Sequence, residues 1–303
     1  MAIASDKVRR ARPLLGTFVE IEAAGAAKSK MDGAIDAAFE AVAQVHRLMS
    51  FHDDDSDVSR LNREAWLRPV KVDAWTFRVL EAAVELHRRS KGIFDIAVAP
   101  TLQNMGLLPR PDGDPPIGSQ ARSFDAVELL EGQRVRFGGR GIRIDLGGIA
   151  KGFAVDRALE VLRGFGLASG LVNAGGDLAA FGREPQTIHI RHPCDPRRLM
   201  CRVEITDEAL ASTARRFDLL SSAETTGSAI IDPATGKPTG VIDGATVRAG
   251  SCMMADALTK IVMICGTGAI EWLELYNASA LLISGDGDVR ITPDWHHAVH
   301  LAA

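Results

Sequence analysis

The stretch IDLGGIAKGFAVDRALEVLRGFGLASGLVNAGG, residues 144–176, decides the fold of this chain. The apolar residues at 143–146 predict a short strand, and a pair of glycines interrupts it. From Ile149 onward the apolar residues recur at helical spacing until the GFG triplet at 164–166. A second strand is expected at 171–173, so the stretch predicts the order strand, glycine turn, helix and strand.

The start of this helix is a candidate anion site. Glycines let a ligand approach the backbone closely, and the first N–H groups of a helix attract phosphate. Lys151 lies in the first turn, where a cation is unfavourable for the helix dipole unless an anion binds there. The alternative is an ordinary packing unit with a solvated lysine. The glycine spacing does not match the G-x-G-x-x-G motif of dinucleotide-binding domains.

Composition argues against several classes of function. The chain has 303 residues, with 35 Lys and Arg against 39 Asp and Glu, a formal net charge of −4. There is no basic surplus for nucleic-acid binding, and with 5% aromatic residues a base-stacking surface is not expected. The four cysteines form no C-x-x-C pair, so neither a disulfide framework nor a zinc site is predicted. The sequence shows no signal peptide and no membrane span, which predicts a cytoplasmic location.

The rest of the chain predicts further helices and strands around this stretch. Helices are expected at 31–51, 76–90 and 251–265, and Ser56 is a candidate N-cap for a short helix through Leu61. Strands are expected at 17–23, 126–130, 134–137, 187–192, 202–205, 209–212, 241–249, 281–284 and 289–291. Loops are predicted at 109–118 and 221–228, and a turn-rich hinge at 230–240.

The segment ADALTK, residues 255–260, combines a carboxylate, a hydroxyl and an ammonium on one helix. Asp256 and Thr259 lie three residues apart, and Asp256 and Lys260 lie four apart, so both pairs share a helical face. A carboxylate with a hydroxyl and a backbone carbonyl is an oxygen set suited to Mg²⁺. The alternative is a surface turn of helix with an ordinary Asp–Lys pair.

Seven short motifs occur in an order that resembles the ApbE family, the FAD:protein FMN transferases. They are LLGT, MSFHDDDSDVSRLN, FDIAVAP, DLGGIAKGFAVD, NAGGD, IIDPATG and ADALTK. Each motif is weak alone, but seven in one order are very specific. The resemblance runs from Pro13 to the end of the chain. It implies an α+β, T-fold-like architecture of mixed sheets with packed helices, in one domain at 13–303 after an N-terminal extension at 1–12.

The resemblance also implies an activity. Members transfer FMN from FAD, with Mg²⁺, onto a threonine hydroxyl of an acceptor protein and release AMP. The expected partners are therefore FAD and an acceptor protein with a flavinylation-motif threonine. Two alternatives remain open: a non-catalytic FAD-binding protein, or an FAD pyrophosphatase that gives free FMN and AMP.

Site residues follow from the resemblance position by position. The cofactor-binding positions it implies are Leu15, Gly16, Thr17, His52, Phe94, Asp95, Gly148, Lys151 and Ile231. The metal ligands it implies are Ala150, through its carbonyl, with Asp256 and Thr259. For catalysis we expect Lys151 to neutralise phosphate and Asp232 to serve as base or orienting carboxylate. Asp232 precedes a proline, so its alternative role is to form a turn.

The chain departs from the family pattern at two chemical positions. Where the family commonly has His-Ile-Ile-Asp-Pro, residues 229–233 are AIIDP, so the histidine implicated in catalysis is missing. Other histidines that can replace it are His46, His52, His87, His189 and His192. The family's metal-binding hydroxyl lies four residues after the aspartate, and here that residue is Lys260. Either Thr259 turns in as a substitute, or Lys260 takes over part of the metal's electrostatic role.

Overall fold

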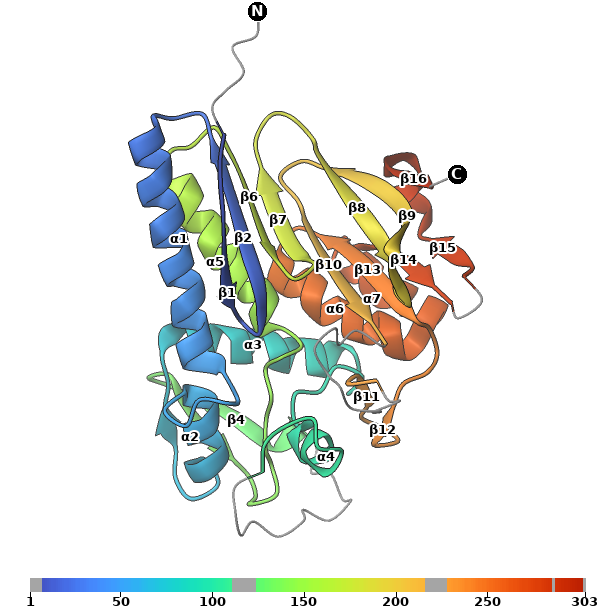
Figure 1. Cartoon of the computed structure of the whole chain (residues 1–303). Helices are drawn as coiled ribbons and strands as arrows, with labels where there is room; N and C mark the ends of the chain where they lie inside the picture. The colour runs from blue at the N-terminus through green and yellow to red at the C-terminus, as the bar shows by residue number, and fades with distance from the viewer. Residues whose placement is uncertain (1–6, 111–123, 216–227, 285–286, 302–303) are drawn as a thin grey trace, which may run out of the picture.

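A large antiparallel sheet forms the centre of the molecule (Figure 1). The computed structural model describes residues 7–110, 124–215, 228–284 and 287–301. In spatial order the strands of this sheet are β1 (Lys7–Leu14), β2 (Thr17–Ala24), β6 (Ser169–Ala174), β7 (Asp177–Phe181), β10 (Ala209–Ala214), β13 (Gly244–Ala249), β14 (Ser279–Ile283) and β15 (Val289–Ile291). Every pairing between these neighbours is antiparallel.

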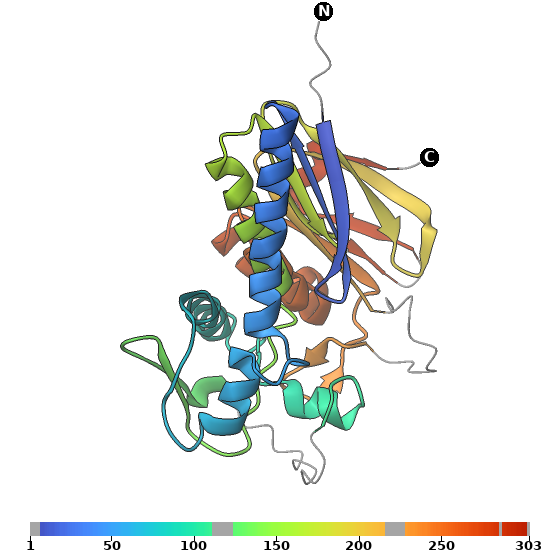
Figure 2. The same ribbon diagram turned by 60° about the vertical axis from the view of Figure 1, so that its left-hand side comes forward.

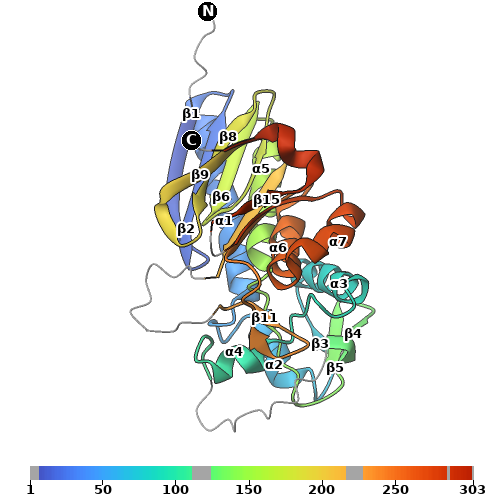
Figure 3. The same cartoon turned by 90° about the vertical axis from the view of Figure 1, so that its right-hand side faces the viewer.

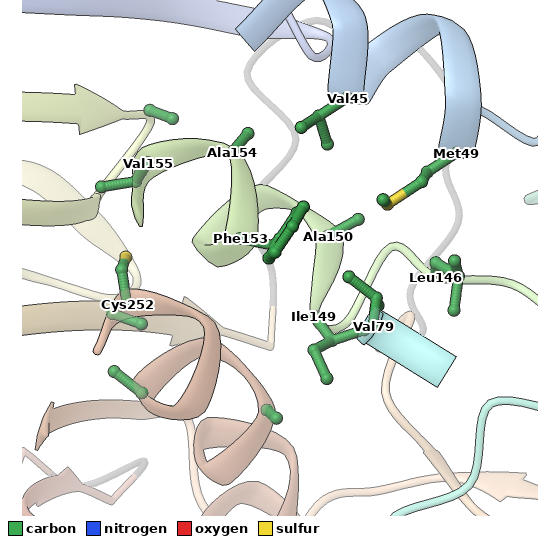
Figure 4. Packing of buried hydrophobic residues seen from close by; sticks show 14 of the residues in the cluster. Val45, Met49, Val79, Leu146, Ile149, Ala150, Phe153, Ala154, Val155 and Cys252 are labelled. Atoms are coloured by element: carbon green, nitrogen blue, oxygen red, sulfur yellow. The ribbon is translucent and has the colours of Figure 1, made fainter. Parts of the chain in front are cut away.

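Three long helices cover one face of this sheet. They are α1 (Lys28–Met49), α5 (Ala150–Gly164) and α6 (Cys252–Cys265), and α5 lies between the other two. Nine apolar residues of α1, from Met31 to Met49, recur at helical spacing and are buried. Figure 4 shows the start of α5 enclosed by side chains of α1, of α3 and of the first turn of α6. The main hydrophobic core therefore lies directly behind the glycine turn that precedes α5.

A small sheet covers the opposite face (Figures 2 and 3). It consists of β8 (Gln186–His192), β9 (Asp195–Ile205) and β16 (Val299–Leu301), and a short 3₁₀ helix, η3 (Pro293–Ala298), precedes β16. Its inward residues form a second apolar cluster with the outer face of the main sheet, around the fully buried Trp295. The part of the main sheet beneath the small sheet is thus buried on both faces, which accounts for the all-buried strands β7 and β14.

A second unit lies at one end of the main sheet (Figure 1). It contains α2 (Asp57–Glu64), α3 (Ala74–Arg89), α4 (Ala99–Asn104), the 3₁₀ turn η1 (Phe124–Ala126) and a three-stranded sheet of β3 (Val70–Lys71), β5 (Arg134–Phe137) and β4 (Val127–Leu130). The two-residue strands β11 (Ile231–Asp232) and β12 (Lys237–Pro238) form a small hairpin nearby. Asp57 fixes this unit internally, because its carboxylate accepts bonds from the Asp73 N–H and the Thr76 hydroxyl, each at 2.8 Å.

Most of the predicted elements are confirmed, and so is the α+β fold class. Ser56 caps α2 by accepting the Ser59 N–H at 3.0 Å, and Ser251 caps α6 in the same way through Met254. Residues 7–12, expected within an N-terminal extension, belong to β1 and pair with β2. The loop predicted at 109–118 and the one at 221–228 lie largely outside the described residues.

The strand predicted at 143–146 is wrong. This segment is irregular, although Ile144 and Leu146 are fully buried. The Asn62 side chain replaces the partner strand: its amide nitrogen donates to the Ile144 carbonyl at 2.9 Å, and its oxygen accepts the Ile144 N–H at 2.8 Å. The next N–H, that of Asp145, donates to the Ile96 carbonyl. The buried backbone of this segment makes its hydrogen bonds to a side chain instead of to a neighbouring strand. A run of apolar residues was therefore not sufficient to predict a strand.

One helical stretch in the described part of the chain has the length and hydropathy of a membrane span. It runs from Cys252 to Leu275, with a mean hydropathy of 1.4. It consists of α6, a 3₁₀ turn η2 (Gly266–Ala269) and the short helix α7 (Ile270–Leu275). More than half of the most apolar window is buried inside the fold, and α6 packs on α5 and on the main sheet. We therefore interpret the stretch as core helices.

Gly152 sets the distance between α5 and α6. A Cβ atom at this position would overlap the carbonyl oxygen of Cys252. We predict that Gly152→Ala destabilises the fold by about 1–3 kcal/mol, because two packed helices would have to separate. Gly164→Ala, at the other end of the same helix, has open space around its Cβ and should be neutral or slightly stabilising. Urea unfolding of both variants measures this, and equal midpoints would contradict it.

Candidate functional site

Two tight turns and a helix start meet at the end of the main sheet that faces the second unit. The β1–β2 turn is formed by Leu15 and Gly16, both with positive φ, and the β6–β7 turn is formed by Gly175 and Gly176. The two turns touch, because a Cβ on Gly175 would lie 2.6 Å from the hydroxyl oxygen of Thr17. The Leu15–Thr17 motif and the NAGGD motif, far apart in sequence, therefore form one surface.

Lys151 and Asp177 form a buried ion pair beside these turns. Lys151 lies in the first turn of α5, and its ammonium donates to Asp177 at the start of β7. The Asp177 side chain is 1% exposed, whereas the Lys151 side chain is 34% exposed. The second oxygen of Asp177 has no hydrogen-bond partner among the described residues. Asp177 thus anchors Lys151 from behind, and Lys151 presents its charge outward.

Asp256 and Lys260 form a second ion pair, one turn apart on α6. Asp256 is completely buried, and one of its oxygens accepts the ammonium of Lys260. Its other oxygen accepts the Gly152 N–H of α5 at 3.1 Å. The expected pairing across α6 is therefore present, but it is in the core and not on the surface.

Two threonine hydroxyls complete the surroundings of the Lys260 ammonium. Lys260 donates to Thr259 at 3.1 Å and to Thr213 of β10 at 3.3 Å, in addition to Asp256. An ammonium has three donors, and all three are used. Thr259 donates its own proton to the Asp256 carbonyl at 2.7 Å, and it lies 2.8 Å from the Thr213 hydroxyl. The network is closed: each described donor has an oxygen acceptor.

The four charges perturb one another because water is excluded. Burial raises the pKa of Asp256, but Lys260 and Lys151 lower it by more, so the net shift is downward. Burial lowers the pKa of Lys151, and Asp177 and Asp256 more than offset this, so Lys151 stays protonated. Burial raises the pKa of Asp177, and Lys151 offsets only part of that rise. Two ammonium groups and two carboxylates thus balance within one small volume.

The glycine turn before α5 passes directly over Lys260. A Cβ on Gly148 would lie 3.3 Å from the Lys260 side-chain Cε, so glycine leaves room for the lysine stem. Asp145 precedes this turn and accepts the Gly147 N–H at 3.1 Å. Burial raises the Asp145 pKa, although the bond from the Gly147 N–H and the nearby His52 and Lys260 oppose the rise. Through its own N–H bond to Ile96, Asp145 connects the turn to the FDIAVAP segment.

A pocket of about 450 Å³ opens on the other side of that segment. Asp95, Ile231 and Asp232 line it, which brings three of the predicted site residues together. Burial raises the pKa of Asp95, whose carboxylate accepts the Ala97 N–H at 2.6 Å. His87 also lines the pocket, but both of its ring nitrogens face oxygens, those of Phe94 and Asp125, at 2.9 and 3.0 Å. Both ring nitrogens of His87 are therefore engaged by oxygens of the protein.

Three other predicted site residues, Phe94, His52 and Asp232, are not part of the charge cluster. The Phe94 ring is 3% exposed and packs in the core, so this motif offers Asp95 and backbone rather than an aromatic face. His52 is exposed, close enough to Asp145 to influence its charge. Asp232 accepts the Ala234 N–H at 2.9 Å and the Thr235 hydroxyl at 3.0 Å. Its carboxylate thus forms the β11–β12 turn, and a catalytic role for it stays a prediction.

The residues expected to bind Mg²⁺ do not fit that ion as they stand. Both oxygens of Asp256 already accept bonds from the protein, and the Thr259 oxygen accepts the Lys260 ammonium at 3.1 Å. Ala150 begins α5 as expected, beside Asp256. No group of three His, Cys, Asp or Glu side chains suited to a metal occurs among the described residues. An ammonium lies against the carboxylate that a metal would need.

Sequence reasoning missed three members of this site. Asp177 is the last residue of the NAGGD motif, which we quoted without assigning its carboxylate. Asp145 carries the same signal, as the first residue of DLGGIAKG. Thr213 lies on a strand with no motif around it, and only the fold brings it to Lys260. An acidic residue at the boundary of a glycine motif was thus a usable signal, whereas the position of Thr213 was not predictable locally.

Comparisons with known proteins show which family this chain resembles. The family model described as "ApbE family" matches residues 15–282. The FAD:protein FMN transferase of Vibrio cholerae is 30% identical over 278 residues, which cover 86% of this chain and 82% of that protein. The one from Treponema pallidum is 28% identical and covers 93% of this chain and 85% of its own length. The crystal structure of the ApbE protein from Thermotoga maritima has a TM-score of 0.86 at 24% identity and covers 97% of this chain and 99% of its own.

The buried pair on α6 should be strongly coupled. We predict that Lys260→Met lowers the free energy of unfolding by about 3–5 kcal/mol, because it leaves Asp256 buried without its counter-ion. The double variant Asp256→Leu/Lys260→Met should recover much of that loss. The exposed pair Lys28–Asp32 has the same spacing on α1, and there Lys28→Met should change stability by less than about 0.5 kcal/mol. Urea unfolding measures all three, and a double variant no more stable than Lys260→Met would contradict the coupling.

Proposed function

Because the chain belongs to the ApbE family, we propose that this enzyme is a FAD:protein FMN transferase that modifies a threonine of an acceptor protein. The threonine oxygen attacks the phosphorus on the FMN side of the pyrophosphate. The bond from that phosphorus to the bridging oxygen breaks, and AMP leaves with that oxygen. The hydroxyl proton passes to a base or to solvent. The product is a phosphoester between FMN and the acceptor.

The arrangement of Lys151 carries this proposal. Its ammonium is anchored by Asp177, is partly exposed, and lies in the first turn of α5 beside the glycine turn. Donation to Asp177 uses one of its three protons, which leaves two for phosphate oxygens. A fixed cation at this point neutralises charge on the bridging oxygen as AMP departs. A lysine held by a buried aspartate is costly to maintain for packing alone.

The rest of the FAD molecule has a continuous set of contacts available. The Gly147–Gly148 turn leads from Lys151 to Asp145, and Asp145 bonds to the segment that ends at the pocket of Asp95 and Ile231. A pocket of about 450 Å³ is within the usual range for small ligands. We propose that one ring system of FAD binds there and that Thr17, Gly16 and Leu15 border the other end. No step is assigned to Mg²⁺, since its expected ligands are already engaged.

The missing histidine determines the expected rate. Ala229 occupies its position and is exposed, so no imidazole is available there. Loss of a general base typically costs about 10²–10⁴-fold. We therefore propose slow transfer, in which Asp232 or water accepts the proton. A cytoplasmic location stays a prediction.

The direct test is incubation of the full chain with FAD and an acceptor domain bearing a flavinylation threonine, followed by mass spectrometry. A mass gain of FMN on the acceptor, with AMP in solution, is the expected result. Lys151→Ala should lose most of it, because its phosphate contact is gone. Free FMN and AMP without labelling would indicate a pyrophosphatase instead. Tight FAD binding without turnover, while the Vibrio cholerae relative labels the same acceptor, would indicate a non-catalytic FAD-binding protein.

A histidine placed at position 229 should increase the rate of FMN transfer. We predict that Ala229→His accelerates FMN transfer by about 10²–10⁴-fold. The acceleration should fall away below about pH 6, where an unperturbed imidazole is protonated. Ala229→Gln, of similar size but unable to accept a proton at neutral pH, is the matched control and should transfer at the wild-type rate. Equal rates for the histidine and glutamine variants would show that position 229 does not face the reacting hydroxyl.

A further inference from the structure

The Lys260 ammonium lies within a set of oxygens that resembles a cation site. Asp256, Thr259 and Thr213 supply one oxygen each, from two elements, α6 and β10. The Lys260 side chain is 15% exposed and Asp256 is fully buried, so this is not a surface pair. Gly148 lies close enough to the lysine stem that a larger residue there would crowd it. The Lys260 side chain is therefore enclosed over most of its surface, by oxygens at its ammonium and by the glycine turn along its stem.

Every oxygen around the Lys260 ammonium already has a partner, and the unpartnered carboxylate oxygen, Asp177 Oδ1, belongs to the neighbouring Lys151 pair. The Asp256 oxygens accept Lys260 and Gly152, and the Thr259 oxygen accepts Lys260 while its proton goes to the Asp256 carbonyl. Hydrogen-bond arithmetic then requires Thr213 to donate to Thr259 while it accepts from Lys260. A divalent ion bound at Asp256 would have to displace the Lys260 ammonium. The ion would then lie close to two ammonium groups, those of Lys260 and Lys151, and would be repelled by both.

We infer that Lys260 is a built-in replacement for the divalent cation, so that this enzyme binds FAD and acts on it without a metal. The inference deepens the proposed function and rests on it for the identity of the substrate. Lys260 provides a fixed positive charge behind the glycine turn, and Lys151 provides the donors that reach the phosphate oxygens. Together they supply two positive charges, as one Mg²⁺ would, each balanced by its own buried aspartate.

The first measurement uses the unmodified protein. Mn²⁺, which replaces Mg²⁺ at oxygen sites and is visible by electron paramagnetic resonance, is titrated into the full chain with and without FAD. FAD affinity is measured in parallel by flavin fluorescence, in EDTA and in excess Mg²⁺. We expect no bound Mn²⁺ and the same FAD affinity in both buffers. Mn²⁺ that binds the wild type and is released by Asp256→Asn would overturn the inference.

The second measurement converts the site. Lys260→Ser places a hydroxyl four residues after Asp256 and removes the ammonium. This variant should bind one Mn²⁺ per chain, and its FAD affinity should fall by about tenfold in EDTA and recover with Mg²⁺, the effect of losing and regaining one nearby positive charge. The same change at the exposed Lys71, Lys71→Ser, should alter neither property.

The conversion remains informative if Asp256 without its counter-ion prevents folding. A Lys260→Ser chain that melts early in EDTA and regains a cooperative transition with Mn²⁺ supports the inference in the same way. A folded Lys260→Ser chain that takes up no Mn²⁺ contradicts it. None of these readouts requires an acceptor protein. A failure of FMN transfer with EDTA-insensitive FAD binding therefore counts against the proposed function, and metal-dependent binding counts against this inference.

Discussion

The structure depends on one contact, in which α5 and α6 approach so closely that a backbone N–H of α5 reaches a carboxylate of α6. Gly152 permits this approach, and its N–H is the donor that Asp256 accepts. Because Asp256 is buried, it requires a partner of opposite charge, and Lys260 satisfies that requirement from the same helix. Lys151 immediately precedes Gly152, and it brings its partner Asp177 to the same contact. The charges of the site are thus held by the packing of two core helices rather than by loops.

Electrostatic balance and hydrophobic packing are closely linked in this arrangement. The start of α5 is surrounded by apolar side chains from three helices, as Figure 4 shows, so water reaches the four charges only from the open side, where the Lys151 side chain is partly exposed. A low-dielectric surrounding strengthens each ion pair and also makes any unpaired charge costly. A pyrophosphate that enters such a site meets cations that are already oriented, and little reorganisation is required at the moment of reaction.

Much of the fold was predictable because local signals agreed with the final structure. Ser56 and Ser251 each cap a helix, and paired strands followed the alternation of β4 and β5. The irregular structure of residues 143–146 was not predictable, because the Ile144 backbone bonds to the side chain of Asn62, eighty-two residues away in sequence. The site shows the same division. Motif order indicated Lys151, Asp256 and Asp95, and the structure brings Lys151 and Asp256 into one cluster. The contact between Lys260 and Thr213 of β10 could not be predicted, because only the fold brings that strand to α6.

The Asn62 amide joins the second unit to the glycine turn, and this has a consequence for motion. Its two bonds to Ile144 are those that a neighbouring strand would make, but a single side chain on α2 makes both. The Ile144 N–H is therefore protected from solvent only while α2 stays against the turn. Amide hydrogen exchange at this one position reports the separation of the two units, whereas exchange within β6 and β7 reports the opening of the main sheet.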